Sequence, residues 1–520
     1  MDNAALSRQS IFDTLRRSAK RNPEKMAIKY LDQQWSYREF FDLSLRVAAG
    51  LEARGIQAGD RVAILSRNSA AFAASRYAIA ALGAILVPVN FMLNTDGASY
   101  ILKHSGARLL LVGAEEKATA LAAAGQCPEL GELIWMDSFH GGETPVEFSP
   151  FESLIADSPF QGETVLPPRA AAQFIYTSGT ESAPKGAVLS HEAVIWQYSS
   201  CQIDAEICQH DVLLHALPLF HCAQLDCFLG PSLQIGGSNI ITADPSPENL
   251  LALLESEQIT SFFAPPTVWI SLLNSPKLET SDLSRLEKGY YGASIMPVEV
   301  IKTLQQRLPR LRLWNLYGQT EIAPVATILK PEDQLRKPGA AGKPVVHVES
   351  RLVDDHGNEV AIGEIGEVVH RSPQLMTEYF NDPDKTAEAF AGGWFHSGDL
   401  AVMDDEGFLT IVDRKKDMIK TGGENVSGRE VEECIYQLPG VAEVAVIGLP
   451  HPRWIEAVCA VVVAKPGMEL CEDSVIRHCE QQLAGFKTPK KIVLVEALPR
   501  NPSGKILKRQ LRDEHATLFI

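Results

Sequence analysis

Apolar and polar positions follow two different periods along the first part of the chain. Residues Ile11 to Ala19 and Tyr37 to Arg54 carry apolar side chains at helical spacing, whereas Met26 to Tyr30 and Arg61 to Leu65 are short apolar runs of strand length. Such an alternation predicts an α/β fold with a parallel sheet between helices. Similar sequence patterns predict strands at Ala107 to Val112, Ala172 to Tyr176 and Val212 to Leu217, and a helix at Pro247 to Glu257.

The pattern changes after about Ala340. Short strands are expected at Glu349 to Val353 and Glu367 to His370, with the turn-forming segment 354–358 between them, which predicts a small β-rich subdomain. Beyond the charged segment Asp413 to Asp417 a compact α+β unit follows. Its expected elements are helices at Ser427 to Gln437 and Glu472 to Leu483, and strands at Val441 to Gly448, Val458 to Ala464 and Lys491 to Val495.

These patterns place a domain boundary at the charged segment. We expect a large N-terminal domain of residues 1–413, built from parallel and mixed sheets flanked by helices together with the β-rich subdomain, and a small α+β C-terminal domain of residues 414–520. A chain of 520 residues is longer than one hydrophobic core usually supports, so at least two domains agree with its length.

Composition excludes several classes of protein. The 45% hydrophobic and 22% charged content is ordinary for a globular protein. Subtracting 65 acidic from 48 basic residues leaves −17, a charge that repels nucleic acid. Nine cysteines without a CxxC pair predict reduced thiols and a cytoplasmic location. The longest apolar run, Ala78 to Val89, is too short to cross a membrane, and the N-terminus lacks the features of a secretory signal.

The first candidate functional segment is 176–186, which follows an apolar strand and precedes a predicted helix that starts near Ser190. It combines hydroxyl groups, free backbone N–H groups and Lys185, a set that can surround the phosphates of a nucleotide, and Gly179 and Gly186 allow a close approach of the backbone. The segment does not match the P-loop pattern, because Pro184 precedes the lysine. The alternative interpretation is a surface turn rich in small residues.

Four further segments accompany this one in a characteristic order. They are Tyr317 to Glu321, Trp394 to Asp399, Asp413 to Asn425 and Pro499 to Lys505. In order and spacing the five segments resemble the core motifs of the acyl-adenylate-forming superfamily, which contains acyl-CoA synthetases, adenylation domains of peptide synthetases and firefly luciferase. The resemblance extends from Ile11 to Gln510 and is closest to fatty-acid and aryl-acid CoA ligases.

The resemblance implies an ATP site and a Mg²⁺ site. The residues it implies for the β- and γ-phosphates are Thr177, Ser178, Gly179, Thr180 and Lys185. Tyr317 matches the aromatic residue that stacks on adenine, with Gly318 beside it, and Thr320 matches a ligand of the α-phosphate. Glu321 and Thr180 match the oxygen ligands of Mg²⁺, a hard cation.

The remaining site residues are also implied by the resemblance. Asp399 matches the acceptor of both ribose hydroxyls, and Arg414 lies where the family has a second ribose or phosphate contact. Lys505 matches the lysine that bridges the substrate carboxylate and the α-phosphate. The segment expected to line the adenine and acyl-carboxylate pocket is Gly292, Ala293 and Ser294.

The implied reaction has two halves. ATP and a carboxylic acid form an acyl-adenylate, the mobile C-terminal domain then rotates about a hinge at Lys416, and the loop with Gly422 and Gly423 admits the pantetheine arm of coenzyme A. Free coenzyme A is favoured over a carrier protein because the chain ends soon after Lys505 and because segment 413–425 resembles acyl-CoA synthetases. The expected partners are therefore small molecules, with a homodimer as the candidate assembly.

The acid is expected to be apolar, because the stretches that should form the pocket carry few charges. They are Cys222 to Leu229, Phe262 to Trp269, Tyr291 to Ser294 and Ile322 to Val325. A medium- or long-chain fatty acid is the main hypothesis, with an aryl or arylpropenoic acid next and carrier-protein loading third. An amino acid would need a buried carboxylate for its ammonium group, and Asp226 is the one acid in these stretches.

Two departures from the family pattern stand out. Glu181 places a carboxylate beside the expected polyphosphate site, and Leu225 follows the Phe220 to Gln224 segment where some long-chain relatives have a gating tryptophan. Because of Glu181, a non-catalytic nucleotide-binding protein on the same fold stays as an alternative, although the presence of Lys505, Glu321 and Asp399 argues against it.

Other chemistries have little support in the sequence. The chain has no GxSxG elbow for a hydrolase and no GxGxxG after a strand for a dehydrogenase. A zinc site is not favoured either, because the local group of cysteines and histidines lacks ligand spacing and is expected to pack in the core. That group is Cys208, His210, His215, His221, Cys222 and Cys227.

Overall fold

The computed structural model describes residues 8–519 except 168, 178–183, 295 and 501–505. The chain divides into two compact units, residues 8–349 with 371–391 and residues 350–370 with 392–519. Internal packing thus groups the β-rich segments 350–370 and 392–413 with the C-terminal residues, whereas the pattern of the sequence placed a boundary after residue 413. The hinge at Lys416 stays a prediction.

The larger sheet of the first unit has nine strands in the order β16-β15-β14-β13-β12-β10-β11-β1-β2. Strands β14, β13, β12, β10, β11 and β1 are parallel to one another. Strand β2 at one edge and strands β15 and β16 at the other are added in antiparallel fashion. The strands are β1 (Met26–Tyr30), β2 (Gln33–Ser36), β10 (Val212–His215), β11 (Ser238–Ile241), β12 (Ser261–Phe263), β13 (Lys288–Gly292), β14 (Arg312–Gly318), β15 (Val325–Leu329) and β16 (Lys343–Pro344).

The second sheet has eight strands in the order β19-β9-β8-β4-β3-β5-β6-β7. It is parallel from β7 to β8, and β9 and β19 extend it in antiparallel fashion. The strands are β3 (Arg61–Leu65), β4 (Ile85–Pro88), β5 (Leu109–Val112), β6 (Leu133–Trp135), β7 (Ser149–Pro150), β8 (Ala171–Thr177), β9 (Lys185–Ser190) and β19 (Glu378–Tyr379).

Helices cover these sheets, and their ends carry clear sequence signals. Ser10 with Asp13 and Ser36 with Glu39 form capping boxes that start α1 and α2, because each pair satisfies backbone N–H groups that the first helical turn leaves free. The helices are α1 (Ile11–Arg21), α2 (Tyr37–Ala53), α3 (Ala70–Ala81), α4 (Thr95–Ser105), α5 (Lys117–Ala124), α6 (His191–Asp204), α7 (Cys222–Gln224), α8 (Gly230–Ile235), α9 (Pro247–Ser256), α10 (Pro266–Asn274), α11 (Val298–Arg307) and α12 (Pro383–Ala389).

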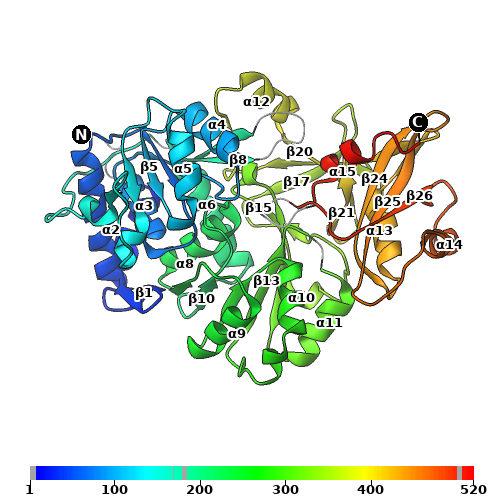
Figure 1. Cartoon of the computed structure of the whole chain (residues 1–520), viewed down its shortest axis with the longest axis horizontal. Helices are drawn as coiled ribbons and strands as arrows, with labels where there is room; N and C mark the ends of the chain where they lie inside the picture. Colours follow the sequence, from blue (N-terminus) through cyan, green and yellow to red (C-terminus); the bar gives the residue numbers. More distant parts are fainter. Residues whose placement is uncertain (1–7, 168, 178–183, 295, 501–505, 520) are drawn as a thin grey trace. The chain divides into compact units, whose positions relative to one another are not determined.

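Each sheet has its own apolar core. The green helices α9, α10 and α11 lie beside β13 in Figure 1, and their residues Leu250, Trp269 and Leu304 pack with strand residues such as Phe262. Helix α3 is buried along its whole length, which explains its alanine-rich sequence: small side chains let neighbouring elements approach from all sides.

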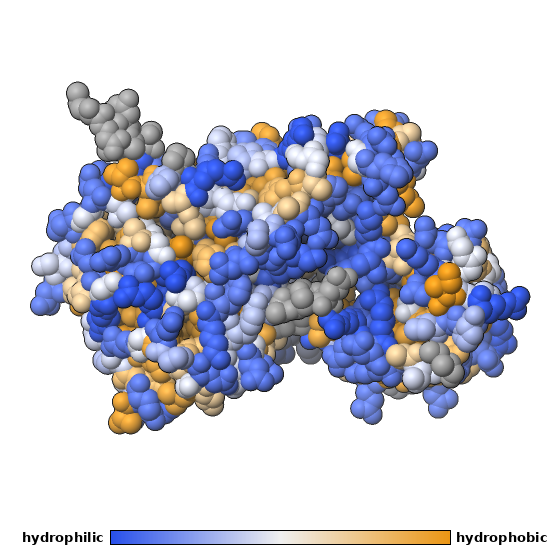
Figure 2. Space-filling model, turned by 90° about the horizontal axis from the view of Figure 1, so that it is seen from above, coloured by the Kyte–Doolittle hydropathy of each residue, from blue (hydrophilic) through white to orange (hydrophobic). Residues whose placement is uncertain are grey.

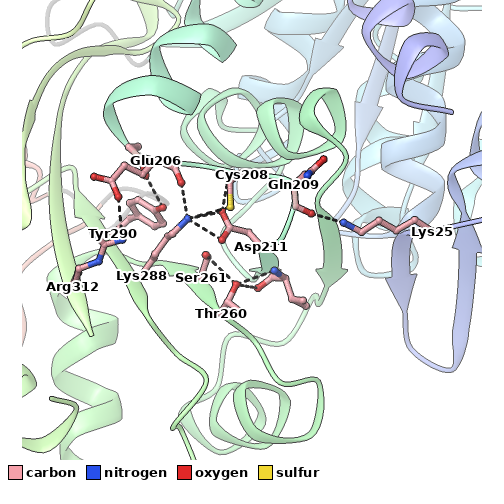
Figure 3. A network of polar contacts seen from close by, with 12 residues as sticks. Lys25, Glu206, Cys208, Gln209, Asp211, Thr260, Ser261, Lys288, Tyr290 and Arg312 are labelled. Carbon is pink, nitrogen blue, oxygen red and sulfur yellow. Dashed lines mark hydrogen bonds and ion pairs between the residues drawn. The ribbon is translucent and has the colours of Figure 1, made fainter. Parts of the chain in front are cut away.

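Charged residues tie together the amino ends of the parallel strands. Figure 3 shows Lys288, the first residue of β13, pointing at Asp211, whose two carboxylate oxygens both lie 2.9 Å from the lysine Nζ. The same Nζ donates to the carbonyl oxygen of Glu206 at 2.6 Å, and Arg312 at the start of β14 pairs with the Glu206 carboxylate at 3.0 Å. We call these residues the amino-end cluster. They lie opposite to the carboxyl ends of the strands, and in open α/β sheets ligands bind at those carboxyl ends.

The second unit contains two sheets. The four-stranded sheet has the order β17-β18-β20-β21, and the other joins β23, β22, β25 and β24, with β26 paired to β25. The strands are β17 (Glu349–Val353), β18 (Ile365–Arg371), β20 (Phe395–Met403), β21 (Leu409–Arg414), β22 (Ile419–Thr421), β23 (Glu424–Val426), β24 (Val441–His451), β25 (Ile455–Ala464) and β26 (Lys491–Val495), and the helices are α13 (Gly428–Tyr436), α14 (Glu472–Gln482) and α15 (Lys508–Glu514). The α/β class, the β-rich part and the terminal α+β part are confirmed.

In the view of Figure 2, hydrophilic residues dominate the surface and apolar residues are scattered among them without forming one continuous patch. In the described part of the chain, none of the helices has the length and apolar character needed to cross a bilayer. All nine cysteines are free thiols.

Candidate active site

The expected phosphate loop joins two paired strands. β8 and β9 form an antiparallel hairpin whose last described pair is Thr177 with Lys185. Ser178, Gly179, Thr180 and Glu181 lie outside the described residues. The strand β9 was not predicted from the sequence, which was interpreted as a loop leading directly into a helix. That helix, α6, begins after β9, with the Ser190 hydroxyl accepting a hydrogen bond from the Ala193 N–H.

The hairpin approaches the segment that carries Glu321. Tyr379, in β19, donates a hydrogen bond from its hydroxyl to Oε1 of Glu321 at 2.8 Å, and Nζ of Lys185 lies 4.9 Å from the centre of its ring. Sequence reasoning missed Tyr379, because both contacts come from residues far away along the chain. The one local feature of the sequence at this place is that Tyr379 is followed by a second aromatic residue, Phe380.

The carboxyl ends of β13 and β14 bring two further predicted segments together. Gly292 is paired with Leu316, and a Cβ at Gly292 would lie 2.6 Å from the Leu316 carbonyl oxygen. At Gly318 a Cβ would lie 2.0 Å from the Pro324 carbonyl oxygen. Only glycine fits either position, because such distances are far inside van der Waals contact. Tyr317 therefore directly precedes a residue, Gly318, whose backbone is packed closely against Pro324.

Two non-glycine residues at these strand ends have left-handed backbone conformations. Ala293 has φ 65° directly after β13, and Ala323 has φ 68° directly after the helical turn Thr320–Ile322. Such conformations are costly for residues with a Cβ and concentrate at functional sites. Ser294, next to Ala293, is exposed.

Thr320 is held from the side of the expected acyl pocket. The Cys222 thiol donates to Oγ1 of Thr320 at 3.5 Å. Burial raises the pKa of the Cys222 thiol to about 12, so it stays protonated at neutral pH and can act as a donor rather than as a nucleophile.

The stretches expected to form the acyl pocket meet in the structure. Phe228 stacks on Phe263 with 4.5 Å between ring centres. Gln197 accepts a hydrogen bond from the Val325 N–H at 3.3 Å and donates to the Cys227 sulfur at 3.6 Å, and so it joins the segment after Glu321 to the segment after His221.

A buried ion pair includes a residue of the stretch Cys222 to Leu229. Asp226 belongs to a π-helix, Leu225–Leu229, and is fully buried. Its Oδ1 lies 2.5 Å from Nη2 of Arg76 on α3, and its Oδ2 accepts a hydrogen bond from Nε2 of Gln173 at 2.6 Å. Arg76 also donates to the Tyr198 hydroxyl at 2.8 Å. Burial raises the pKa of Asp226, while Arg76 acts in the opposite direction.

The second unit holds the other predicted nucleotide contacts. Asp399 on β20 and Arg414 on β21 are directly opposite each other, with 3.4 Å between Oδ1 and Nε. Gly422 and Gly423, with φ 61° and 93°, form the two-residue turn between β22 and β23, a conformation that favours glycine at both places. Lys505 lies outside the described residues.

Members of the group of cysteines and histidines considered for zinc have other partners, and the expectation that the whole group packs in the core is wrong for His210, which is exposed. The ring nitrogens of His215 contact Asn239 at 2.9 Å and Gln224 at 2.7 Å, and Cys208 lies 3.8 Å from Nζ of Lys288. Among the described residues, no set of three or more histidine, cysteine, aspartate or glutamate side chains is arranged to hold a metal ion.

Known proteins resemble the chain over nearly its whole length. Residues 15–380 match the AMP-binding enzyme family, and residues 430–505 match the AMP-binding enzyme C-terminal domain. A feruloyl-CoA synthase of Amycolatopsis is 35% identical over 95% of the chain and 97% of its own length. A long-chain-fatty-acid CoA ligase of Mycobacterium tuberculosis is 36% identical over 93% of the chain and 94% of its own length.

Solved structures agree with these matches. The anthranilate CoA ligase AuaEII in complex with anthranoyl-AMP has a TM-score of 0.90 at 27% identity and covers 98% of both chains. ATP-bound MatB from Rhodopseudomonas palustris has a TM-score of 0.90 at 29% identity, over 99% of this chain and 100% of its own. The chain therefore belongs to the AMP-binding enzyme family, as the motifs predicted, and is an AMP-forming acyl-CoA synthetase.

Proposed function

We propose that the chain converts an apolar monocarboxylic acid, ATP and coenzyme A into an acyl-CoA, AMP and diphosphate. A medium- or long-chain fatty acid is the main candidate substrate, and an aryl or arylpropenoic acid is the second. Relatives of both kinds match the chain at similar identity. Loading of a carrier protein in place of coenzyme A is the less favoured third candidate.

The observation that carries the proposed substrate class is the pairing of Asp226. This residue is the one acid in the four stretches expected to line the acyl pocket. Its carboxylate is fully buried and already bound by Arg76 and Gln173. A substrate ammonium group would have to displace the Arg76 guanidinium from a complete set of contacts, so the pairing favours acids without a positive charge.

The residues near Glu321 suit a Mg²⁺ ion. Glu321 is partly exposed and offers carboxylate oxygens. Tyr379 contacts both Glu321 and the positively charged Lys185. Oxygen ligands are those that Mg²⁺ prefers. We assign Glu321 and Thr180 as its protein ligands, and the bound ion would neutralise charge on the phosphates.

The adenylation step depends mainly on positioning, because a carboxylate is a weak nucleophile. Lys505 would hold the substrate carboxylate against the α-phosphate, and Thr320 and Lys185 would bind phosphate oxygens. The carboxylate oxygen then forms a bond to the α-phosphorus while the bond to diphosphate breaks. Asp399 and Arg414 would bind the ribose.

Thioester formation would use a second arrangement of the domains. We propose that the segment at Lys416 is the hinge and that the turn formed by Gly422 and Gly423 admits the pantetheine arm. The thiol sulfur then attacks the acyl carbon, AMP leaves and the thiol proton passes to solvent. The exposed position of Lys416 between β21 and β22 and the absence of side chains in the turn support these roles.

A panel of acids tests the proposal. Diphosphate release and acyl-CoA formation would be measured with ATP, Mg²⁺ and coenzyme A for fatty acids of increasing length, ferulate-type and simple aryl acids, and amino acids. We expect turnover with apolar acids and none with amino acids. Equal turnover with amino acids, or no turnover with any apolar acid, would refute the proposed substrate class.

A further inference from the structure

Tyr379 lies between two residues assigned to Mg²⁺ and ATP. Strand β19 pairs with β9, so Tyr379 is opposite Ala187, two residues after Lys185. From there its hydroxyl reaches Oε1 of Glu321 at 2.8 Å, while Nζ of Lys185 lies 4.9 Å from its ring centre. One side chain therefore touches both the carboxylate and the cation.

Backbone contacts around Tyr379 hold the same elements in place. The Met376 N–H donates to the carbonyl oxygen of Glu321 at 2.8 Å, and the Phe380 N–H donates to that of Gly186 at 2.8 Å. Segment 376–380 thus binds the backbone beside both functional side chains. The position of the Tyr379 ring is consequently fixed relative to Glu321 and to β9.

The hydroxyl of Tyr379 is suited to be a permanent donor. The side chain is 8% exposed, so little water reaches its hydrogen bond with Glu321. A protonated hydroxyl can hold one carboxylate oxygen without competing with a cation for the charge of the carboxylate.

We propose that Tyr379 is a positioning residue for Mg²⁺-ATP, orienting the Glu321 carboxylate through its hydroxyl and the Lys185 ammonium group through its ring. This inference rests on the proposed function, because the roles of Glu321 and Lys185 come from it. The two parts of the side chain have separate tasks: the hydroxyl acts on the metal ligand and the ring on the phosphate ligand.

Two substitutions separate these tasks. Tyr379→Phe removes the hydroxyl and keeps the ring, so the Mg²⁺ concentration that half-saturates ATP binding should rise about tenfold, as expected for a lost hydrogen bond to a charged group. ATP affinity at saturating Mg²⁺ should stay within about twofold. Tyr379→Leu also removes the ring and should weaken ATP binding at saturating Mg²⁺ by a further two- to fivefold, the range of a cation–π contact.

Tyr37→Phe is the matched control. The Tyr37 hydroxyl is also buried and donates to the Gly237 carbonyl oxygen at 2.6 Å, but the residue lies on α2 and contacts none of the assigned site residues in the described part of the chain. It should lower stability to a comparable extent and leave the Mg²⁺ dependence of ATP binding unchanged.

The measurement is titration calorimetry of the full-length protein with ATP at a series of Mg²⁺ concentrations, without any acid. An unchanged Mg²⁺ dependence in Tyr379→Phe, with a wild type that binds Mg²⁺-ATP, would overturn the inference and leave the proposed function intact. Failure of the acid panel, with the Mg²⁺ shift present, would instead reject the proposed substrates and support the role of Tyr379.

Discussion

Removal of Arg76 should destabilise the protein in a strongly pH-dependent way. In Arg76→Met the side-chain volume is largely kept, but Asp226 stays fully buried and loses its cation. Loss of one partner of a buried ion pair typically costs about 3–5 kcal/mol. This range is expected here because Arg76 and Asp226 are only 2% and 0% exposed, so water cannot replace the missing contact.

The same magnitude follows from the protonation of Asp226. Without Arg76 the buried carboxyl group of Asp226 should bind a proton. Protonating a carboxyl group whose ordinary pKa is about 3.9 costs about 4 kcal/mol at pH 7 but only about 1.5 kcal/mol at pH 5. The unfolded chain releases this proton at lower pH than the folded one, so the stability of the variant falls as pH rises. The loss should therefore more than double between pH 5 and pH 7.

Urea unfolding followed by fluorescence at the two pH values tests this expectation. Arg310→Met is the matched control, because Arg310 and its partner Glu287 are 62% and 42% exposed and should contribute less than about 1 kcal/mol at either pH. The double variant Arg76→Met/Asp226→Leu should recover much of the loss and its pH dependence. A loss that is equal at pH 5 and pH 7 would refute the argument.

Four other predictions remain, of which three concern the assigned site and one concerns a buried acid. Asp399→Ala should raise the dissociation constant of ATP about ten- to a hundredfold, because two ribose hydroxyls lose their acceptor, as measured by calorimetry; an unchanged constant would contradict the assignment. Lys505→Ala should slow diphosphate release about 10²–10³-fold while sparing thioester formation from supplied acyl-adenylate, and equal slowing of both steps would reject the role of the lysine. Gly423→Leu should do the reverse, with Gly407→Leu, at a φ of 83° and in similarly open space, as the control for backbone strain. Burial raises the pKa of Glu116 to about 7, so Glu116→Gln should stabilise the protein at pH 8, by roughly 1–3 kcal/mol, and much less at pH 5, with urea unfolding as the check.

Local sequence signals predicted much of the fold. The strands Met26–Tyr30, Arg61–Leu65 and Lys491–Val495 lie where the pattern placed them, and α2 ends one residue before the expected position. In each case the signal is local, because apolar residues at strand or helical spacing are neighbours in the chain.

The errors have a different physical origin. Strand β9 is short, and it exists because it pairs with β8 on one side and with the distant β19 on the other. Long-range pairing decided this strand, and single-sequence patterns do not contain such pairing. The prediction of a buried core at Ala78 to Val89 is confirmed, and Gly83, with φ 69°, separates the end of α3 from β4 within that run.

The candidate site divides in the same way. Glu321, Asp399 and Lys185 could be proposed from motifs because the residues of each motif are neighbours in the chain. The contacts of Tyr379 with Glu321 and of Arg76 with Asp226 join residues separated by 58 and 150 positions. Arg76 in particular lies in an alanine-rich helix, where an arginine would ordinarily be expected to reach solvent.

The amino-end cluster around Lys288 has a consequence for engineering this protein. Its ion pairs join residues at the amino ends of β10, β13 and β14, while the segments expected to contact the acid follow the carboxyl ends of the strands. Libraries confined to the loops after β10, β12 and β13 should therefore vary the acceptable acid without eroding foldability. Combinatorial diversification can be concentrated there, with the lysine–aspartate contact kept as a constant anchor.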